Sequence, residues 1–159
     1  MTKHPMKTRY PAPAATVLRM LTDRDFHARK LEKLGLPKYE ILDHAFDGQQ
    51  FRIRIERRVP VTMPGGKKAG ETTVINEEHW NLAERKGVVK VETKGMPLQM
   101  SCDSSIAEDG DGCIVTLDWS IEAKIPVVGG QFEKFVVNDI ESRAADETRV
   151  ALELLEDYR

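Results

Sequence analysis

The chain has 159 residues, of which 31% are charged and 40% are hydrophobic, with a formal net charge of -2 and a sequence pI near 6.1. A chain of this length is predicted to form one domain, 1–159, with a substantial core. The balanced charge argues against a nucleic-acid-binding or anionic-membrane-binding surface. No apolar run resembles a signal peptide or approaches the length of a membrane span, so we expect a cytoplasmic protein.

The N-terminal part of the chain is predicted to contain one strand and two short helices. Apolar and polar side chains alternate over 3–10, which predicts a strand. Pro13 suits the first position of a helix over 14–21, because the N–H that proline lacks would have no partner there. Asp23 is predicted to cap a second helix that runs to Leu34.

The middle of the chain is predicted to form three β-hairpins that share one apolar face, because apolar and polar residues alternate on both sides of each turn. The predicted strand pairs are 39–46 with 50–59, 72–83 with 87–94, and 98–107 with 113–125. In the second hairpin, a turn at 85–86 would place Trp80 opposite Val91. A mobile loop is predicted over 63–70, where glycines and lysines follow a proline.

The two cysteines are predicted to stay reduced. A hairpin turn at 109–112 would place Cys102 opposite Trp119 and Cys113 opposite Glu108, which is too far apart for a disulfide. The histidines lack metal-ligand spacing, and the Asp-Gly repeat lacks the spaced ligands and closing Glu of a calcium loop. Neither a nucleophile elbow nor a phosphate-binding glycine motif occurs. The sequence therefore predicts no metal and no cofactor, and it identifies no catalytic residue.

The C-terminal segment is predicted to form one long helix from Gly130 to Tyr158, since paired glycines end the strand before it. Its apolar residues recur with helical spacing and form one stripe. The stripe consists of Phe132, Phe135, Val136, Ile140, Ala144, Ala151, Leu154 and Leu155. Arg143 and Glu147 interrupt it. They form either an i,i+4 ion pair at the edge of the stripe or a polar anchor that faces an internal cavity.

The element order, with a long terminal helix that follows the segment VVGGQFE at 127–133, resembles the START-like superfamily. This group includes lipid-transfer START domains, birch-pollen allergen relatives and polyketide cyclases. The resemblance covers essentially the whole chain and is strongest to a bacterial family of uncharacterised START-like proteins. It implies an α+β helix-grip fold: a curved antiparallel sheet wraps around the C-terminal helix, and two short helices lie between strands 1 and 2. It also implies a cavity for hydrophobic ligands and carries over no catalytic residues.

The candidate ligand-binding residues lie on the predicted inner face of the sheet or on the facing side of the helix. Apolar contacts are assigned to Phe51, Trp80, Met100, Trp119, Phe132 and Phe135, and polar anchors to His44, Glu78, Arg143 and Glu147. Leu42 is expected on the same inner face as His44. Each aromatic side chain also suits an ordinary core position. His44 and Glu78 must either reach water at the sheet rim or orient the polar group of a ligand.

The leading functional hypothesis is a small-molecule binding or carrier protein for a hydrophobic or amphipathic ligand, such as a lipid, quinone or polyketide. An alternative is an enzyme of the aromatase/cyclase type, in which His44 and Glu78 would transfer protons to and from one substrate atom in a closed cavity. A second alternative is a protein-interaction module. The predicted exterior has mixed charges and no apolar stripe, which counts against that last hypothesis.

Overall fold

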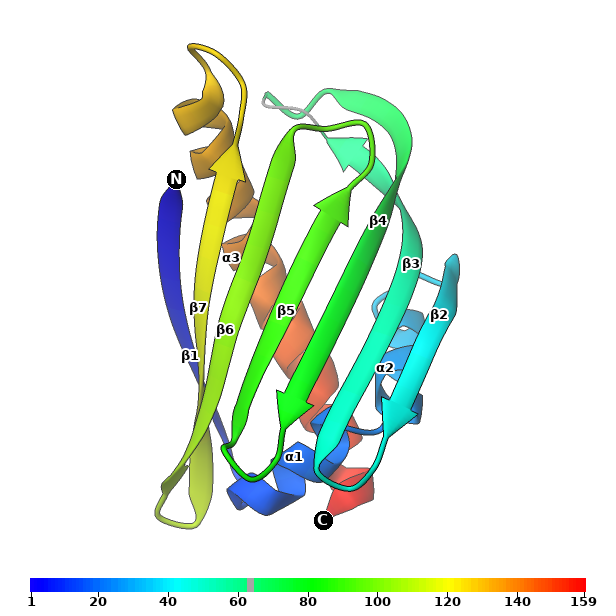
Figure 1. The fold of residues 1–159 in the computed structure, drawn as a ribbon, viewed down its shortest axis with the longest axis vertical. Coiled ribbons are helices and arrows are strands. Elements are labelled where there is room, and N and C mark those ends of the chain that lie inside the picture. Colours follow the sequence, from blue (N-terminus) through cyan, green and yellow to red (C-terminus); the bar gives the residue numbers. More distant parts are fainter. Residues whose placement is uncertain (63–64) are drawn as a thin grey trace.

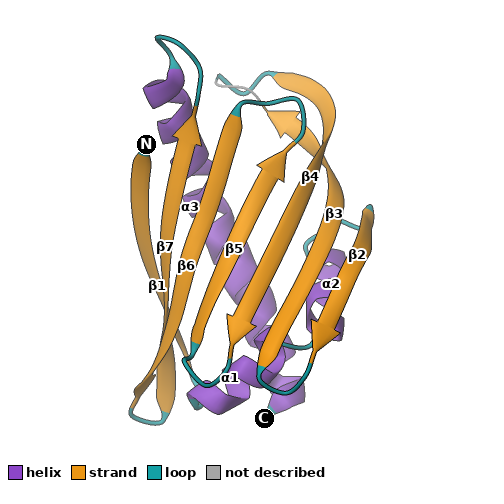
Figure 2. Cartoon of the chain, viewed as in Figure 1, coloured by secondary structure: helices purple, strands orange, loops and turns teal. Residues whose placement is uncertain are grey.

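A computed structural model describes residues 1–62 and 65–159. Seven antiparallel strands form one sheet in the order β1-β7-β6-β5-β4-β3-β2, and the helices cover one face of it (Figures 1 and 2). The elements are β1 (Thr2–Tyr10), α1 (Ala14–Leu21), α2 (Arg24–Lys33), β2 (Tyr39–Phe46), β3 (Gln50–Thr62), β4 (Lys68–Asn81), β5 (Lys86–Thr93), β6 (Leu98–Asp109), β7 (Gly112–Ala123), α3 (Gly129–Leu155) and a 3₁₀ turn, η1 (Glu156–Tyr158). The predicted helix-grip architecture is confirmed.

The two short helices form where the local sequence provides their starts. The carbonyl oxygen of Pro13 accepts the backbone N–H groups of Thr16 and Val17 at the start of α1. The side chain of Asp23 accepts the backbone N–H of Asp25 at 3.0 Å, which caps α2 as predicted. Asp23 also accepts the hydroxyl of Tyr158 at 2.6 Å, so the start of α2 is joined to the end of the chain.

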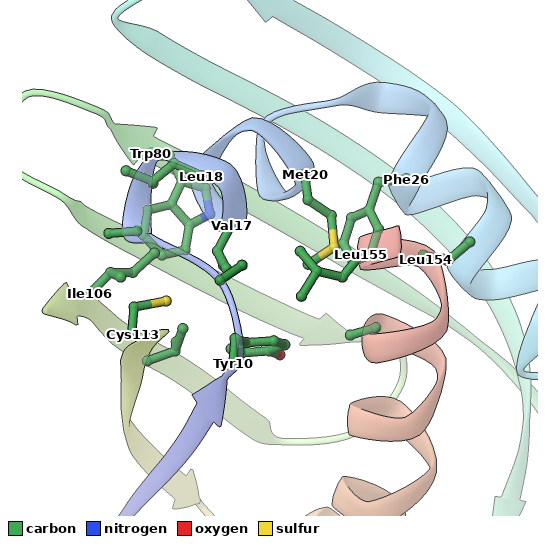
Figure 3. Packing of buried hydrophobic residues seen from close by; sticks show 14 of the residues in the cluster. Tyr10, Val17, Leu18, Met20, Phe26, Trp80, Ile106, Cys113, Leu154 and Leu155 are labelled. Carbon is green, nitrogen blue, oxygen red and sulfur yellow. The ribbon is translucent and has the colours of Figure 1, made fainter. Parts of the chain in front are cut away.

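The core divides into two clusters. The first lies where α1, α2 and the C-terminal end of α3 meet the sheet, and Figure 3 shows its closely packed side chains. It includes Tyr10, Val17, Met20, Phe26, Trp80, Leu154 and Leu155. The second lies under the N-terminal end of α3 and includes Leu98, Ile121, Ala123, Phe132 and Val136. The middle of α3, between these clusters, is mostly exposed.

A buried carboxylate holds the N-terminal end of α3 against the sheet. Glu133 accepts the hydroxyl of Thr2 at 2.6 Å and the backbone N–H of Ala123 at 3.0 Å. These hydrogen bonds lower the pKa of Glu133. The carboxylate therefore joins β1, β7 and α3, and sequence periodicity gave no indication of this role.

The strand register places one row of side chains across the concave face. Ile53, Glu78, Val89, Cys102 and Trp119 lie directly opposite one another on β3, β4, β5, β6 and β7. Residues that are directly opposite share a face, so Glu78 points to the same side as the helices. Cys102 faces Trp119 as predicted, and both cysteines are free and buried.

The predicted pairing of β4 with β5 is wrong by four residues. Trp80 lies opposite Gly87 rather than Val91, and Val91 lies opposite Asn76. The turn spans four residues, 82–85, instead of the two-residue turn that we expected at 85–86. A shift of the register by an even number of residues leaves every side chain on the same face of the sheet. The predicted inner face is therefore correct although the predicted pairing is not.

Two further predictions are corrected in the neighbouring strands. A β-bulge between Ile41 and Asp43 places Ile41 and His44 opposite Ile55 and Ile53, so Leu42 leaves the inner face and is 42% exposed. The loop predicted over 63–70 is shorter, because β4 already begins at Lys68. Its first two residues, 63–64, lie outside the described part of the chain.

Candidate functional site

A cavity of about 330 Å³ lies between α2, the strands β3 to β5, and the middle of α3. Its apolar wall combines side chains from the end of α2 and the segment after it with others from the concave face of the sheet. These are Leu31, Leu34, Leu36, Ile53, Ile55, Pro60 and Val89. Its polar lining consists of His27, Lys30, Arg57, Asn76, Glu78, Arg143, Asp146 and Glu147. The cavity therefore offers an apolar surface together with a few polar groups, as ligand pockets do.

His27 and Glu78 form the most deeply buried polar contact of the cavity. The ring of His27 stacks on Phe51 at a centroid distance of 5.6 Å, and its side chain is 6% exposed. Its Nε2 lies 2.8 Å from the carbonyl oxygen of Leu21 and 3.3 Å from Oε2 of Glu78. One N–H cannot point at both oxygens, and the shorter contact to Leu21 satisfies it. Oε2 of Glu78 is buried and has no hydrogen-bond partner among the described residues.

Burial determines the protonation state of His27. Burial lowers the pKa of His27, because desolvation disfavours the imidazolium, and the carboxylate of Glu78 opposes that effect only in part. His27 is therefore neutral near pH 7 and donates Nε2–H to Leu21. The free oxygen of Glu78 remains available to accept a proton or a hydrogen bond from a molecule in the cavity.

A second polar pair lies further along the same strands. Arg57 is half-buried on the concave face of β3, and its Nε and Nη2 donate to Oδ1 of Asn76 at 3.0 and 2.8 Å. Burial lowers the pKa of Arg57; Glu147 acts in the opposite direction and Arg143 in the same direction. The paired hydrogen bonds fix the guanidinium plane. A neutral amide does not compensate its charge.

The third group comes from α3 on the other side of the cavity. Nε of Arg143 lies 3.2 Å from Oδ1 of Asp139, one turn earlier, so the predicted i,i+4 ion pair with Glu147 does not form. Arg143 pairs with Asp139 because Asp139 is also four residues away, and an acidic residue on the N-terminal side of its basic partner is the more favourable i,i+4 arrangement. Arg143 and Glu147 both line the cavity and are exposed to solvent, so the polar-anchor interpretation stays a prediction.

The structure brings together three of the ten predicted site residues: Glu78, Arg143 and Glu147. Phe51 and Trp80 are buried in the first core cluster. Met100, Trp119 and Phe132 belong to the second cluster or pack against it, and Phe135 lies beside Phe132 at a centroid distance of 6.2 Å. Met100 also lines a separate hollow of about 420 Å³ with charged side chains such as Glu77, Lys90 and Glu92. Ligand contact by these residues stays a prediction.

His44 does not lie beside Glu78. It occupies the exposed edge strand β2, where its ring meets that of Phe51 edge-on at 5.8 Å. Strand β3 separates it from Glu78, a distance of roughly 10 Å at the usual strand spacing. The structure thus supports the rim interpretation of His44, and His27 is the histidine that contacts Glu78.

Two further cavity-lining residues could have been found from patterns already present in the sequence. His27 lies four residues before Leu31 and seven before Leu34, which puts it on the apolar side of its helix. Arg57 continues the alternation of Phe51, Ile53 and Ile55 onto the inner face, where a charge requires a partner. Both signals mark a polar residue on a face that is otherwise apolar.

Among the residues that the structure describes, no helix is long and apolar enough to cross a membrane. Within residues 1–62 and 65–159, no group of three or more His, Cys, Asp or Glu side chains is arranged to hold a metal ion.

Comparison with known proteins identifies the family. A family model described as "Protein of unknown function (DUF2505)" matches residues 5–155. The chain belongs to this family. No curated protein matches the chain.

Solved structures with the same fold span the whole chain. TTHA0849 from Thermus thermophilus is 19% identical with a TM-score of 0.68, and the match covers 98% of each chain. A START superfamily protein from Mycobacterium smegmatis is 18% identical with a TM-score of 0.58 over 99% of each chain. Norcoclaurine synthase from Thalictrum flavum, in complex with dopamine and hydroxybenzaldehyde, is 14% identical with a TM-score of 0.64, over 99% of this chain and 88% of that one. These likenesses show the fold and agree with the predicted helix-grip architecture.

Proposed function

We propose that this chain binds or carries an amphipathic small molecule in the cavity between α2, β3 to β5 and α3. The observation that carries the proposal is the composition of the cavity. An apolar wall built from residues such as Leu34, Ile55 and Val89 adjoins polar groups, and one of these, Oε2 of Glu78, is buried without a partner in the described part of the chain. An apolar ligand alone would leave the polar groups of the cavity without partners, whereas a ligand with one polar end can bond to one of them.

The cavity volume narrows the ligand class. About 330 Å³ lies at the lower end of the roughly 300–1,000 Å³ of small-molecule pockets. A single medium-length chain or a compact ring system suits this space, and a lipid-like, quinone-like or polyketide-like skeleton remains the proposed type. The norcoclaurine synthase structure supports the proposal by analogy, since a protein of this fold is there in complex with two small molecules.

Two experiments test the proposal. Native mass spectrometry of the purified protein, followed by denaturing extraction, would detect a retained small molecule directly. Thermal-shift assays with decanoic acid, 1-decanol and decylubiquinone would then measure stabilisation, because a ligand that binds only the folded state raises the melting temperature. We expect at least one of these amphiphiles to raise it.

Adjacent valines on β5 provide a matched pair of variants. Val89 lines the cavity, whereas Val88 lies on the opposite face and is 37% exposed. Val89→Phe should fill part of the cavity and reduce the thermal shift, and Val88→Phe adds the same atoms to the exposed face and should leave it unchanged. An equal response of the two variants, or no shift with any of the three compounds, would contradict the proposal.

The contact between His27 and Glu78 favours proton-transfer catalysis as a second candidate function. Glu78 would accept a proton from an acidic C–H of a bound ketone, water would return a proton to the same carbon, and Glu78 would then release its proton to the hydroxide that remains. This replaces the predicted pair of His44 and Glu78, because His27 is the histidine within 3.3 Å of the carboxylate. Deuterium exchange at the carbons next to the carbonyl of 2-decanone in D₂O should be faster with the protein and lost in Glu78→Gln. Equal exchange with both proteins would contradict catalysis.

A further inference from the structure

The guanidinium of Arg57 is held in place on the concave face without a negative partner among the described residues. Its Nε and Nη2 both donate to one oxygen of Asn76, at 3.0 and 2.8 Å. An arginine side chain has five N–H bonds, so three of them remain to donate to a ligand on the side of the guanidinium away from Asn76. No described carboxylate forms an ion pair with Arg57, although neighbouring Arg54 on the opposite face pairs with Glu77 at 3.4 Å.

None of the other charged groups of the cavity, Glu78 and Asp146 included, forms an ion pair with Arg57 among the described residues. Arg143 faces the cavity from α3 and already pairs with Asp139 at 3.2 Å. Glu147 is exposed on α3 and acts on Arg57 only through space. Lys30 contributes a further cation from α2, with its Nζ 5.6 Å from the ring centre of Phe26. A half-buried cation is ordinarily paired with an anionic group. Within residues 1–62 and 65–159, the hydrogen bonds of Arg57 go to a neutral amide instead.

We propose that the cavity recognises the carboxylate head group of an amphipathic ligand through the remaining N–H groups of Arg57, with the apolar chain of the ligand against Ile55, Val89 and the leucines after α2. This inference rests on the proposed function, since it names the ligand class of the same cavity. Asn76 is a positioning residue, because it fixes the plane in which the guanidinium presents two parallel N–H groups.

A single negative charge fits this environment better than a double one. One guanidinium without an ion-pair partner among the described residues matches one carboxylate, which accepts two parallel hydrogen bonds from it. The second charge of a phosphate monoester would face the carboxylates of Glu78 and Glu147, which line the same cavity. The chain would then lie along Ile55, the residue before Arg57 on the same face of β3, and Val89 on β5.

Decanoate and 1-decanol test the inference, because they share a chain and differ in charge. Isothermal titration calorimetry at pH 7.5 should show about tenfold or tighter binding of decanoate to the wild-type protein, as expected for a charge-assisted pair of hydrogen bonds. Arg57→Met should abolish that preference while it retains binding of 1-decanol. Arg58→Met is the matched control, since Arg58 is the next residue of β3 and is exposed on the opposite face.

Asn76→Asp provides a variant that keeps the side-chain volume. It would place a carboxylate at the 2.8 Å position beside Arg57, so decanoate binding should fall about tenfold relative to 1-decanol binding. Equal affinity of the wild-type protein for both ligands would overturn this inference and leave the proposed function standing. A preference that persists in Arg57→Met and Asn76→Asp would also overturn it. Binding of neither ligand would overturn this inference, and the proposed function would fall with it only if decylubiquinone also failed to raise the melting temperature.

Discussion

Acidification from pH 7.5 to 5.5 should destabilise the protein through His27. This side chain is 6% exposed, stacks on Phe51, and has its Nε2 2.8 Å from the carbonyl oxygen of Leu21. Burial lowers its pKa, and the nearby carboxylate of Glu78 only partly opposes this effect. The unfolded chain therefore binds a proton on His27 more readily than the folded protein does.

The sign and size of the effect follow from linkage. Because the folded-state pKa is the lower one, the stability contribution is fully present above the unfolded value of about 6.5 and is lost as the pH falls below it. One proton contributes at most about 1.4 kcal/mol for each pH unit below that value. Since pH 5.5 is one unit below it, the loss from His27 is at most about 1.4 kcal/mol. Glu133 and Asp43, whose pKa values are lowered, lose their contributions only in more acidic solutions, below about 4.5.

Urea unfolding at pH 7.5, 6.5 and 5.5, followed by tryptophan fluorescence, measures this change. The wild-type protein should lose stability between pH 6.5 and 5.5, and His27→Gln should lose less because its side chain does not titrate. His79→Gln is the control, since His79 is exposed on the opposite face of β4 and should behave like the wild type. An identical pH dependence for His27→Gln and the wild type would refute the assignment to His27.

Two other predictions concern packing and thiol chemistry. A Cβ at Gly87 would lie 2.6 to 2.9 Å from three ring atoms of Trp80, so Gly87→Ala should lower the free energy of unfolding by about 1–3 kcal/mol. Gly130→Ala, where nothing lies within 4 Å, should not lower it, and equal losses in urea unfolding would contradict the packing argument. Burial raises the pKa of Cys102 to about 11 and also raises that of Cys113. Ellman's reagent at pH 8 should therefore label Cys102 about 100-fold more slowly in the folded protein than in urea, and fast native labelling would contradict its burial.

Alternation along the strands was sufficient to predict the sheet, because a period of two assigns each residue to a face regardless of its exact partner. For that reason Glu78 was placed on the inner face even though its predicted partner was wrong. The register between β4 and β5 depends on the length of a turn, and the four residues 82–85 carry no strong turn signal. The bulge beside Leu42 likewise has no glycine to mark it.

The cavity was harder to predict than the fold, because α2 supplies one of its walls. A strand pattern does not indicate where a short helix packs, so the contact between His27 and Glu78 depends on tertiary structure alone. The aromatic residues Trp119 and Phe132 were predicted to contact a ligand because of their size and face. In the structure they pack around one end of α3, while the cavity opens beside its middle.

The location of ligand binding is the central claim, and an NMR titration tests it most directly. Backbone amide resonances of the ¹⁵N-labelled protein would be followed as decanoate is added. We expect the largest shifts at residues that line the cavity, such as Leu34, Ile55 and Val89. Shifts confined to the hollow around Met100 and Glu92, or no shifts at all, would contradict this location.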